Sequence, residues 1–391
     1  MRSLVTSPRF GHTKAVANVS AARGSLPILG LTSEAFAHHA RERVGPGHGV
    51  WRQVYRAAFE GRFAPEELGV SSAAIERWRS AFHVDLAAPA RRVDEPSLHP
   101  VDVRETAKVA LRTHDGLEIE SVRIPMSKGR STLCLSSQVG CRLGCRFCET
   151  GRLGLLRNLT PEEIVGQVVV ARSVLGWRVD NLVFMGMGEP LDNAEHLVTA
   201  LRVLTDSRGL AFGQQKITVC TSGVPEGLRT LGRLGFRRMG LSFSLNAATD
   251  AQRDRLMPIN RRHPLAEMQR ALKDYPTREG FVLALNYCLL PGWNDAASDA
   301  EAVARFVAPL GRTLVNVIPY NPGTKPLTRA PTRQEVDSFV AQLRGQGLAV
   351  RERKTKGRSV MAACGQLGNL ELREVRRGRA TLPVLEPKVS R

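Results

Sequence analysis

The sequence lacks any long apolar run, and no stretch approaches the roughly 18 apolar residues that suggest a membrane span. We therefore expect no membrane partner. The beginning of the chain also lacks an apolar segment of the kind found in secretory signals, and its first acidic residue is Glu34. An Arg-rich, acid-poor start is typical of an organelle transit peptide or of a flexible basic tail, and we favour a tail over residues 1–28.

Negative charge is scarce along the whole chain. Only 37 Asp and Glu residues stand against 56 Lys and Arg residues, which gives a formal net charge of +19 and a pI near 10.5. An excess of this size attracts polyanions and speeds their association. Nucleic acid is therefore the first candidate partner, while a basic proteome or an anionic membrane surface would also account for part of the excess.

Cysteines are few and odd in number, at positions 134, 141, 145, 148, 220, 288 and 364. A secreted disulfide framework is usually denser and even-numbered. We expect instead a cytoplasmic protein, because a reducing compartment leaves clustered thiolates free to bind metal.

The order of residue patterns predicts one large domain with an appendage. Helical spacing predicts a small all-helical domain from residue 29, followed by a linker at 85–100. A β-hairpin is expected at 106–125, and strands then alternate with helices, which favours a parallel sheet, open or curled into a partial barrel. Catalytic groups are expected at the carboxyl ends of its strands. We assign residues 101–375 to this domain and 376–391 to a basic tail.

The individual elements of the large domain are predicted from apolar runs and capping residues. Capping boxes at Thr160–Glu163 and Thr332–Glu335 each predict a helix start. Strands are expected at 181–187, 217–221, 239–245, 282–290, 314–318 and 348–353, and further helices at 193–206, 263–274 and 296–309.

The most specific motif is a compact loop in which Cys141, Cys145 and Cys148 have C-x3-C-x2-C spacing. Three thiolates this close can bind three irons of a [4Fe-4S] cluster, which normally takes four cysteine ligands. The fourth iron is then open to a small molecule, and the amino and carboxylate groups of S-adenosylmethionine (SAM) suit it. The alternative is a zinc site with Cys134 as the fourth ligand.

Longer strings of residues resemble a known family. The cysteine loop followed by Met185-Gly186-Met187-Gly188-Glu189-Pro190 resembles the radical SAM superfamily. The strings 134–141, 148–151, 157–160 and 362–367 are similar to those of the RlmN/Cfr class of RNA adenine methyltransferases. The resemblance covers about residues 29–370 and implies an α/β fold, a partial (β/α)6 radical SAM barrel with a small N-terminal all-helical domain.

The resemblance also implies a mechanism with two SAM molecules. Adenine carbons C2 and C8 are electrophilic, so a methyl cation has nothing to attack there. In the family, one SAM methylates a cysteine, which here matches Cys364. A second SAM is cleaved to a 5′-deoxyadenosyl radical, which removes hydrogen from the S-methyl group, and the methylene radical adds to the adenine. Cys134 matches the thiol that releases the RNA by attacking the Cys364 sulfur, which forms a disulfide bond, and Glu120 matches the base that takes the ring proton.

Several positions match residues that bind SAM in the family. Gly188 and Glu189 match the turn that binds the SAM amino group, and Asn321 matches a further SAM contact. Two positions depart from the family pattern: Cys220 replaces a SAM-contacting Ser, and the family string Ser-Leu-His reads Ser244-Leu245-Asn246. Asn cannot become cationic as His can. We expect cofactor binding to survive both changes, whereas the substrate is less firmly implied.

The implied substrate is RNA, with C2 of an adenine in 23S rRNA favoured and tRNA as a second candidate. Val139 stands where Cfr-like chains tend to have Cys, which favours C2. The alternatives are a Cfr-type C8 methyltransferase, a paralogue with another RNA target, a radical SAM enzyme with a non-RNA substrate, and a non-catalytic, zinc-stabilised RNA-binding protein. An electron donor such as flavodoxin or ferredoxin is implied. Candidate phosphate contacts are Arg152, Arg157, Arg261, Arg262, Arg351, Arg353, Lys354, Lys356 and Arg358.

Overall fold

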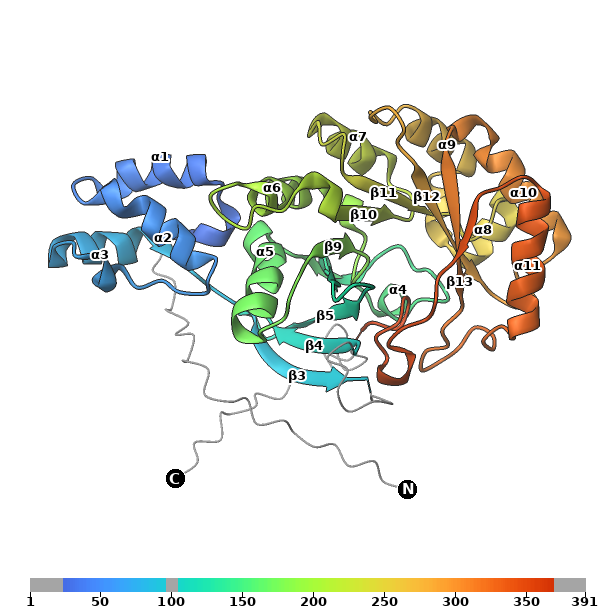
Figure 1. Ribbon diagram of the computed structural model, residues 1–391, viewed down its shortest axis with the longest axis horizontal. Coiled ribbons are helices and arrows are strands. Elements are labelled where there is room, and N and C mark those ends of the chain that lie inside the picture. Colours follow the sequence, from blue (N-terminus) through green and yellow to red (C-terminus); the bar gives the residue numbers. More distant parts are fainter. Residues whose placement is uncertain (1–23, 96–104, 369–391) are drawn as a thin grey trace, which may run out of the picture.

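The computed structural model describes residues 24–95 and 105–368 (Figure 1). The predicted basic tails therefore lie outside the described residues, except for residues 24–28 of the first.

Three helices form the N-terminal part of the described chain: α1 (Ser33–Val44), α2 (Trp51–Ala58) and α3 (Ser72–Ala81). Thr32 caps α1, because its side chain accepts a hydrogen bond from the backbone N of Ala35 at 3.3 Å. Phe36, Tyr55 and Trp78 are fully buried between the helices, with the Phe36 ring centroid 5.3 Å from that of Tyr55. The three helices predicted by the spacing of apolar residues thus share a core of aromatic side chains.

One continuous apolar core joins the helical part to the large domain. A short 3-10 helix, η1 (Ile28–Gly30), lies against α5 (Pro161–Val169) and buries Ile28 and Leu29 completely. Two short strands, β1 (Leu26–Pro27) and β2 (Phe82–His83), pair in parallel and join the two ends of this part. Figure 1 shows α1–α3 at one end of the molecule, next to α5 and α6 (Ala194–Thr205).

The large domain is built on a ten-stranded sheet in the order β14-β13-β12-β11-β10-β9-β6-β5-β4-β3. Seven neighbouring strands are parallel: β6 (Ser131–Cys134), β9 (Asn181–Phe184), β10 (Ile217–Thr221), β11 (Gly240–Ser244), β12 (Leu283–Leu289), β13 (Thr313–Pro319) and β14 (Val350–Glu352). The helices that follow them are α5, α6, α7 (Pro225–Arg233), α8 (Asp250–Leu256), α9 (Leu265–Lys273), α10 (Ala297–Val307) and α11 (Arg333–Gly345). The strand–helix units from β6 to α11 confirm the predicted α/β class and the partial-barrel topology.

The predicted capping boxes begin two of these helices. Thr160 donates its backbone N–H to the Glu163 carboxylate at 3.0 Å at the start of α5. Thr332 does the same to Glu335 at 2.7 Å at the start of α11. Helices α7 and α8 were not predicted from the sequence.

Three antiparallel strands extend the sheet beyond β6: β5 (Glu118–Pro125), β4 (Ala107–Arg112) and β3 (Ala88–Asp94). β4 and β5 confirm the expected hairpin. Residues 88–94 fall in the segment expected to be a linker, and that expectation is wrong for them. Pro89, Arg91 and Arg92 suggest a linker, but they are also tolerated in a strand at the edge of a sheet, where one side makes no ladder hydrogen bonds.

Within the described residues, no helix is long and apolar enough to span a membrane.

Candidate active site

The cysteine loop lies between two short strands and a helix. β7 (Gln138–Cys141) leads into the loop and pairs antiparallel with β8 (Gly154–Asn158), while α4 (Glu149–Leu153) follows the last cysteine. Gly140 has a φ of +79°, and a Cβ on this residue would overlap the carbonyl oxygen of Gly154. A glycine is therefore required where the chain enters the loop.

The loop brings three free thiols into one buried region. Cys141 and Cys145 are each 8% exposed, and Cys148 is half-buried. Burial, together with the nearby Cys148, raises the pKa of Cys145 to about 12. Burial likewise raises the pKa of Cys141 well above its usual value, with Cys145 adding to the effect. Three bare thiolates would repel one another here, so the donor set fits a metal group that binds all three.

A pocket lies at the carboxyl ends of the parallel strands and is bounded on one side by the cysteine loop. The cavity has a volume of about 160 Å³, and the space measured out to its open mouth is about 860 Å³. Among the residues that line it are Cys145, Cys148, Gly188, Glu189, Cys220, Ser244, Asn246 and Cys364. The structure therefore brings together two metal-ligand candidates, five SAM-binding candidates and the candidate methyl carrier.

Glu189 lies in the wall of this pocket and is 3% exposed. Its carboxylate accepts hydrogen bonds from the backbone N–H of Ser222 at 2.8 Å and of Leu191 at 3.1 Å. Burial raises the pKa of Glu189 to about 7, although these hydrogen bonds oppose the shift. The preceding Gly188 has a φ of +96°, and a Cβ there would lie 2.5 Å from the Cβ of Gln138. The turn thus fixes a buried carboxylate that can accept from a cationic ligand.

The two departures from the family pattern have different surroundings. The Cys220 sulfur lies 3.3 Å from the Ser244 hydroxyl and accepts from the Asn286 amide, also at 3.3 Å. Burial raises the pKa of Cys220 to about 11. Asn246 has a φ of +56° and accepts from the backbone N–H of Cys288 at 2.9 Å. Its amide therefore holds the end of β12 in place.

Two SAM-binding candidates do not line the pocket. Leu245, the first residue after β11, is 1% exposed and belongs to the apolar core. Asn321 is 3% exposed and accepts from the Arg358 guanidinium at 3.2 Å. Sequence reasoning missed the lining residues Asn286, Cys288 and Tyr320, although Asn286 and Cys288 lie within the predicted strand 282–290 and Tyr320 lies two residues beyond the predicted strand 314–318.

Cys364 is exposed at the pocket and lies on a segment that packs against the cysteine loop. The backbone N–H of Glu149 donates to the Gly365 carbonyl at 2.8 Å, and the Thr150 hydroxyl donates to the Leu367 carbonyl at 2.5 Å. Cys134 lies at the end of β6 and is 6% exposed. Burial raises the pKa of Cys134, and a negative charge on Cys364 contributes to the increase. The two sulfurs therefore lie close enough to interact electrostatically.

Glu120 lies on β5 in a buried ion pair that sequence reasoning missed. Its carboxylate is 2.9 Å from the ammonium of Lys108, and both side chains are at most 10% exposed. Lys108 also donates to the Met361 carbonyl at 3.0 Å, and Glu120 accepts from the Gly368 N–H at 2.8 Å. Lys108 and Glu120 are diagonal neighbours across the hairpin, which is the one signal in the sequence that points to their contact. The pair anchors the segment that contains Cys364.

The candidate phosphate contacts differ in whether their cationic groups already have partners within the protein. Arg157 forms ion pairs at 2.7 Å with both Asp115 and Glu163, so its guanidinium is already occupied. Arg152 pairs with Glu149 at 3.2 Å, and Arg358 donates to the Tyr320 carbonyl at 2.9 Å. Lys356 donates to the Pro125 carbonyl, and half-buried Arg353 faces the Met185 sulfur at 3.9 Å. The exposed candidates are Arg261, Arg262, Arg351, Lys354, Lys356 and Arg358.

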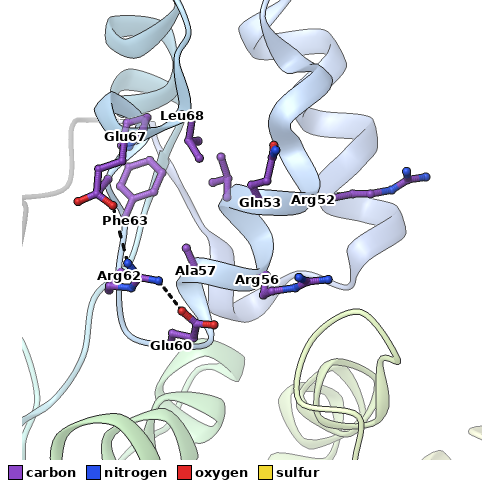
Figure 2. Close-up of a pocket in the computed structure, with 12 residues that line it drawn as sticks. Arg52, Gln53, Arg56, Ala57, Glu60, Arg62, Phe63, Glu67 and Leu68 are labelled. Atoms are coloured by element: carbon purple, nitrogen blue, oxygen red, sulfur yellow. Dashed lines mark hydrogen bonds and ion pairs between the residues drawn. The ribbon is translucent and has the colours of Figure 1, made fainter.

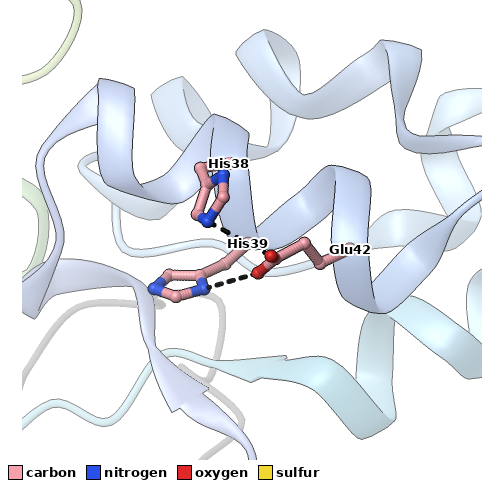
Figure 3. A group of neighbouring side chains, drawn as sticks. All are labelled: His38, His39 and Glu42. Carbon is pink, nitrogen blue, oxygen red and sulfur yellow. Dashed lines mark ion pairs between the residues drawn. The ribbon is translucent and has the colours of Figure 1, made fainter.

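Two features of the helical part contain none of the predicted site residues. One is a surface pocket beside α2, where Arg62 forms ion pairs with Glu60 at 2.6 Å and Glu67 at 3.7 Å (Figure 2). The other is a group on α1 in which Glu42 pairs with His38 at 3.2 Å and His39 at 3.5 Å (Figure 3). His38 is 63% and Glu42 55% exposed, and their mutual ion pairs account for the arrangement.

Comparison with known proteins agrees with this geometry. Residues 135–307 match the family model described as the radical SAM superfamily. A crystal structure of a radical SAM methyltransferase from Sphaerobacter thermophilus is similar with a TM-score of 0.77 and 33% identity, over 87% of this chain and 98% of that one. The fold and the cysteine loop thus define a radical SAM methyltransferase.

The similar sequences narrow the class. A probable dual-specificity RNA methyltransferase RlmN 1 from Protochlamydia amoebophila is 44% identical over 92% of this chain and 98% of its own length. A dual-specificity RNA methyltransferase RlmN from an Anaeromyxobacter species is 47% identical over 67% of this chain and 71% of its own. The chain belongs to the RlmN family of radical SAM RNA methyltransferases. These matches favour an enzyme over the zinc-stabilised RNA-binding protein.

Proposed function

We propose that the protein methylates C2 of an adenine in 23S rRNA, with tRNA as a second substrate. The observation that supports this most directly is the exposure of Cys364 at a pocket also lined by Cys145, Cys148 and Glu189. A thiol in this position can receive a methyl group and still be reached by a nucleotide from outside. Similar sequences named dual-specificity RNA methyltransferases support RNA as the substrate.

The residues proposed to hold the cofactors surround the pocket. Cys141, Cys145 and Cys148 would bind a [4Fe-4S] cluster, which when bound supplies the electron that cleaves SAM. Glu189 would accept hydrogen bonds from the SAM ammonium, with Gly188 fixing the turn. Cys220, Ser244 and Asn246 line the same space, so both departures would touch the cofactor. Leu245 and Asn321 would act through the backbone or through their neighbours, since their side chains do not line the pocket.

The other proposed steps use Cys364, Cys134 and Glu120. Cys364 accepts a methyl group on sulfur and then becomes bonded to the adenine through that carbon. The Cys134 sulfur, close to Cys364, attacks the Cys364 sulfur. A disulfide bond forms, the bond between the Cys364 sulfur and the bridging carbon breaks, and this carbon takes a proton to become the methyl group of the released RNA. Glu120 takes the ring proton, and its pairing with Lys108 supports a carboxylate at this position. The adenine must be unpaired or flipped to reach the sulfur.

We also propose the compartment in which the protein acts and the source of its electron. Ribosomal and transfer RNA are cytoplasmic substrates, and a reducing cytoplasm keeps the seven cysteines as thiols. The electron is expected to come from a carrier such as flavodoxin or ferredoxin.

Mass spectrometry of rRNA and tRNA nucleosides from cells with and without the gene tests the proposed product. Loss of 2-methyladenosine on deletion supports it, loss of 8-methyladenosine would assign a Cfr-type reaction, and no change in either nucleoside would overturn it.

Variants of the purified enzyme test the proposed roles of the cysteines. Cys364→Ala should abolish methylation, and Cys134→Ala should accumulate protein bound covalently to RNA. Cys288→Ala is the matched control, because Cys288 lines the pocket without a proposed role. Wild-type turnover by Cys364→Ala would refute the methyl-carrier role.

A further inference from the structure

A basic and aromatic surface lies directly outside the cysteine loop. Arg146 follows Cys145, and its guanidinium carbon is 5.6 Å from the centroid of the Trp293 ring. The guanidinium carbon of Arg255, on α8, is 5.0 Å from the same centroid. Arg146 and Arg255 are exposed and Trp293 is half-buried. We call these three residues the Arg–Trp–Arg surface.

Backbone contacts hold this surface in a fixed position. The Arg146 N–H donates to the Leu256 carbonyl at 3.0 Å, and its guanidinium donates to the Arg255 carbonyl at 3.5 Å. The backbone N–H of Trp293 donates to the Leu290 carbonyl at 3.0 Å. Stacking on an aromatic ring orders the two guanidinium groups and leaves most of their N–H donors free. The surface is therefore preorganised to bind carboxylates.

The charge of this surface is not neutralised by the protein itself. Arg142, in the same loop, forms an ion pair with Asp192 at 2.8 Å. By contrast, no carboxylate of the described residues lies within ion-pair distance of Arg146 or Arg255. The nearby Asp254 and Asp295 instead accept hydrogen bonds from the Asn260 amide at 2.8 Å and the Gly292 N–H at 2.9 Å. Two ordered cations thus remain available to an external acidic partner.

The surface is also close to the predicted metal ligands. Cys141, Cys145, Leu256 and Met257 belong to one small apolar cluster, and Trp293 packs against it. A protein bound on Trp293 would therefore contact the apolar cluster that contains Cys145. Such an arrangement suits the entry of an electron, because a redox partner needs close approach but no access to the pocket itself.

We propose that the Arg–Trp–Arg surface is the docking site for an acidic one-electron carrier protein. The proposal rests on the proposed function, since it assumes a metal group at Cys141, Cys145 and Cys148. RNA is the competing polyanion. Cys364, which RNA must reach, is preceded by the exposed cations Arg351, Lys354 and Arg358 on and after β14. Trp293 instead packs against the apolar cluster that contains Cys145, so the observations favour the carrier at the cysteine loop.

Charge reversal tests the proposal, with an acidic flavodoxin as the probe. We compare Arg146→Glu/Arg255→Glu with Arg233→Glu/Arg344→Glu, which makes the same change in net charge at exposed arginines of α7 and α11. Binding of flavodoxin is measured by calorimetry at low and high salt. Reduction of the reconstituted protein is followed by stopped-flow absorbance with flavodoxin hydroquinone and, separately, with dithionite.

The first variant should bind flavodoxin at least tenfold more weakly at low salt and be reduced by it at least tenfold more slowly, with a flatter salt dependence. Its reduction by dithionite, and both flavodoxin measurements on the control, should match the wild type. Unchanged flavodoxin binding together with weaker binding of a 23S rRNA fragment would overturn the proposal and assign the surface to RNA. If neither the wild type nor either double variant binds iron on reconstitution, the result would instead contradict the proposed function.

Discussion

The buried pair of Lys108 and Glu120 gives a quantitative prediction about the segment that contains Cys364. Lys108→Met removes the ammonium but keeps a side chain of similar length. The Glu120 side chain, 4% exposed, then has no compensating charge beside it. We expect the segment 357–368 to open more often, because its contacts through Met361 and Gly368 both depend on this pair.

The expected size follows from the burial of both groups. Removing one partner of a buried ion pair typically costs about 3–5 kcal/mol. Because about 1.4 kcal/mol corresponds to a factor of ten, the opening equilibrium should rise by a factor between about 100 and about 4,000. Lys108→Met/Glu120→Gln should recover most of this loss, since Gln is neutral and can still accept from the Gly368 N–H.

Hydrogen–deuterium exchange measured by mass spectrometry reports this opening directly. Peptides from 357–368 should exchange faster in Lys108→Met, while peptides from β10 should exchange as in the wild type. Lys273→Met, at an exposed lysine on α9, is the control. Wild-type exchange in Lys108→Met would show that the pair does not hold the segment. Equal exchange in the single and double variants would show that an uncompensated charge is not the cause.

Two further predictions concern the pocket and its loop. Gly140→Ala should incorporate much less iron on reconstitution than Gly144→Ala. Both glycines have a positive φ, but only a Cβ at residue 140 would overlap the backbone, since the nearest atom to a Cβ at residue 144 is 3.7 Å away. Equal iron content in the two variants would contradict this reasoning. Since burial raises the pKa of Glu189 to about 7, the carboxylate gains a proton as pH falls below 7, and calorimetry should show SAM affinity falling by up to about tenfold per pH unit there. Glu189→Gln should bind SAM weakly with no such pH dependence, and a flat wild-type profile from pH 6 to 8 would refute the assignment.

The parallel part of the fold was predictable because its strands are apolar runs between helices with clear caps. β10 has the predicted bounds, and α11 begins at the predicted capping box of Thr332. β3 was missed because an edge strand lacks the apolar pattern of a buried one, and Arg91 and Arg92 are as compatible with a linker. α8 is short, and charged residues interrupt its apolar face.

The site was predictable where a contiguous string defines it, as in the cysteine loop and the turn at Glu189. It was not predictable where distant segments meet. Lys108 contacts Met361 across most of the chain, and no local pattern identifies such a pair. Leu245 shows a different limit: a matched string identifies a position, but the packing of the folded chain decides that this side chain belongs to the apolar core.

The anchoring of Cys364 also orders events during synthesis. The segment 357–368 is attached to the hairpin through Lys108 and Glu120 and to α4 through Thr150, so it folds onto surfaces that precede it in the chain. Chains emerge from the ribosome N-terminus first, and structure forms in that direction. The loop with the three metal-ligand candidates is therefore translated before the segment that contains Cys364. The pocket is completed only after the segment 357–368 has been made, because Cys364 and Gly365 line it.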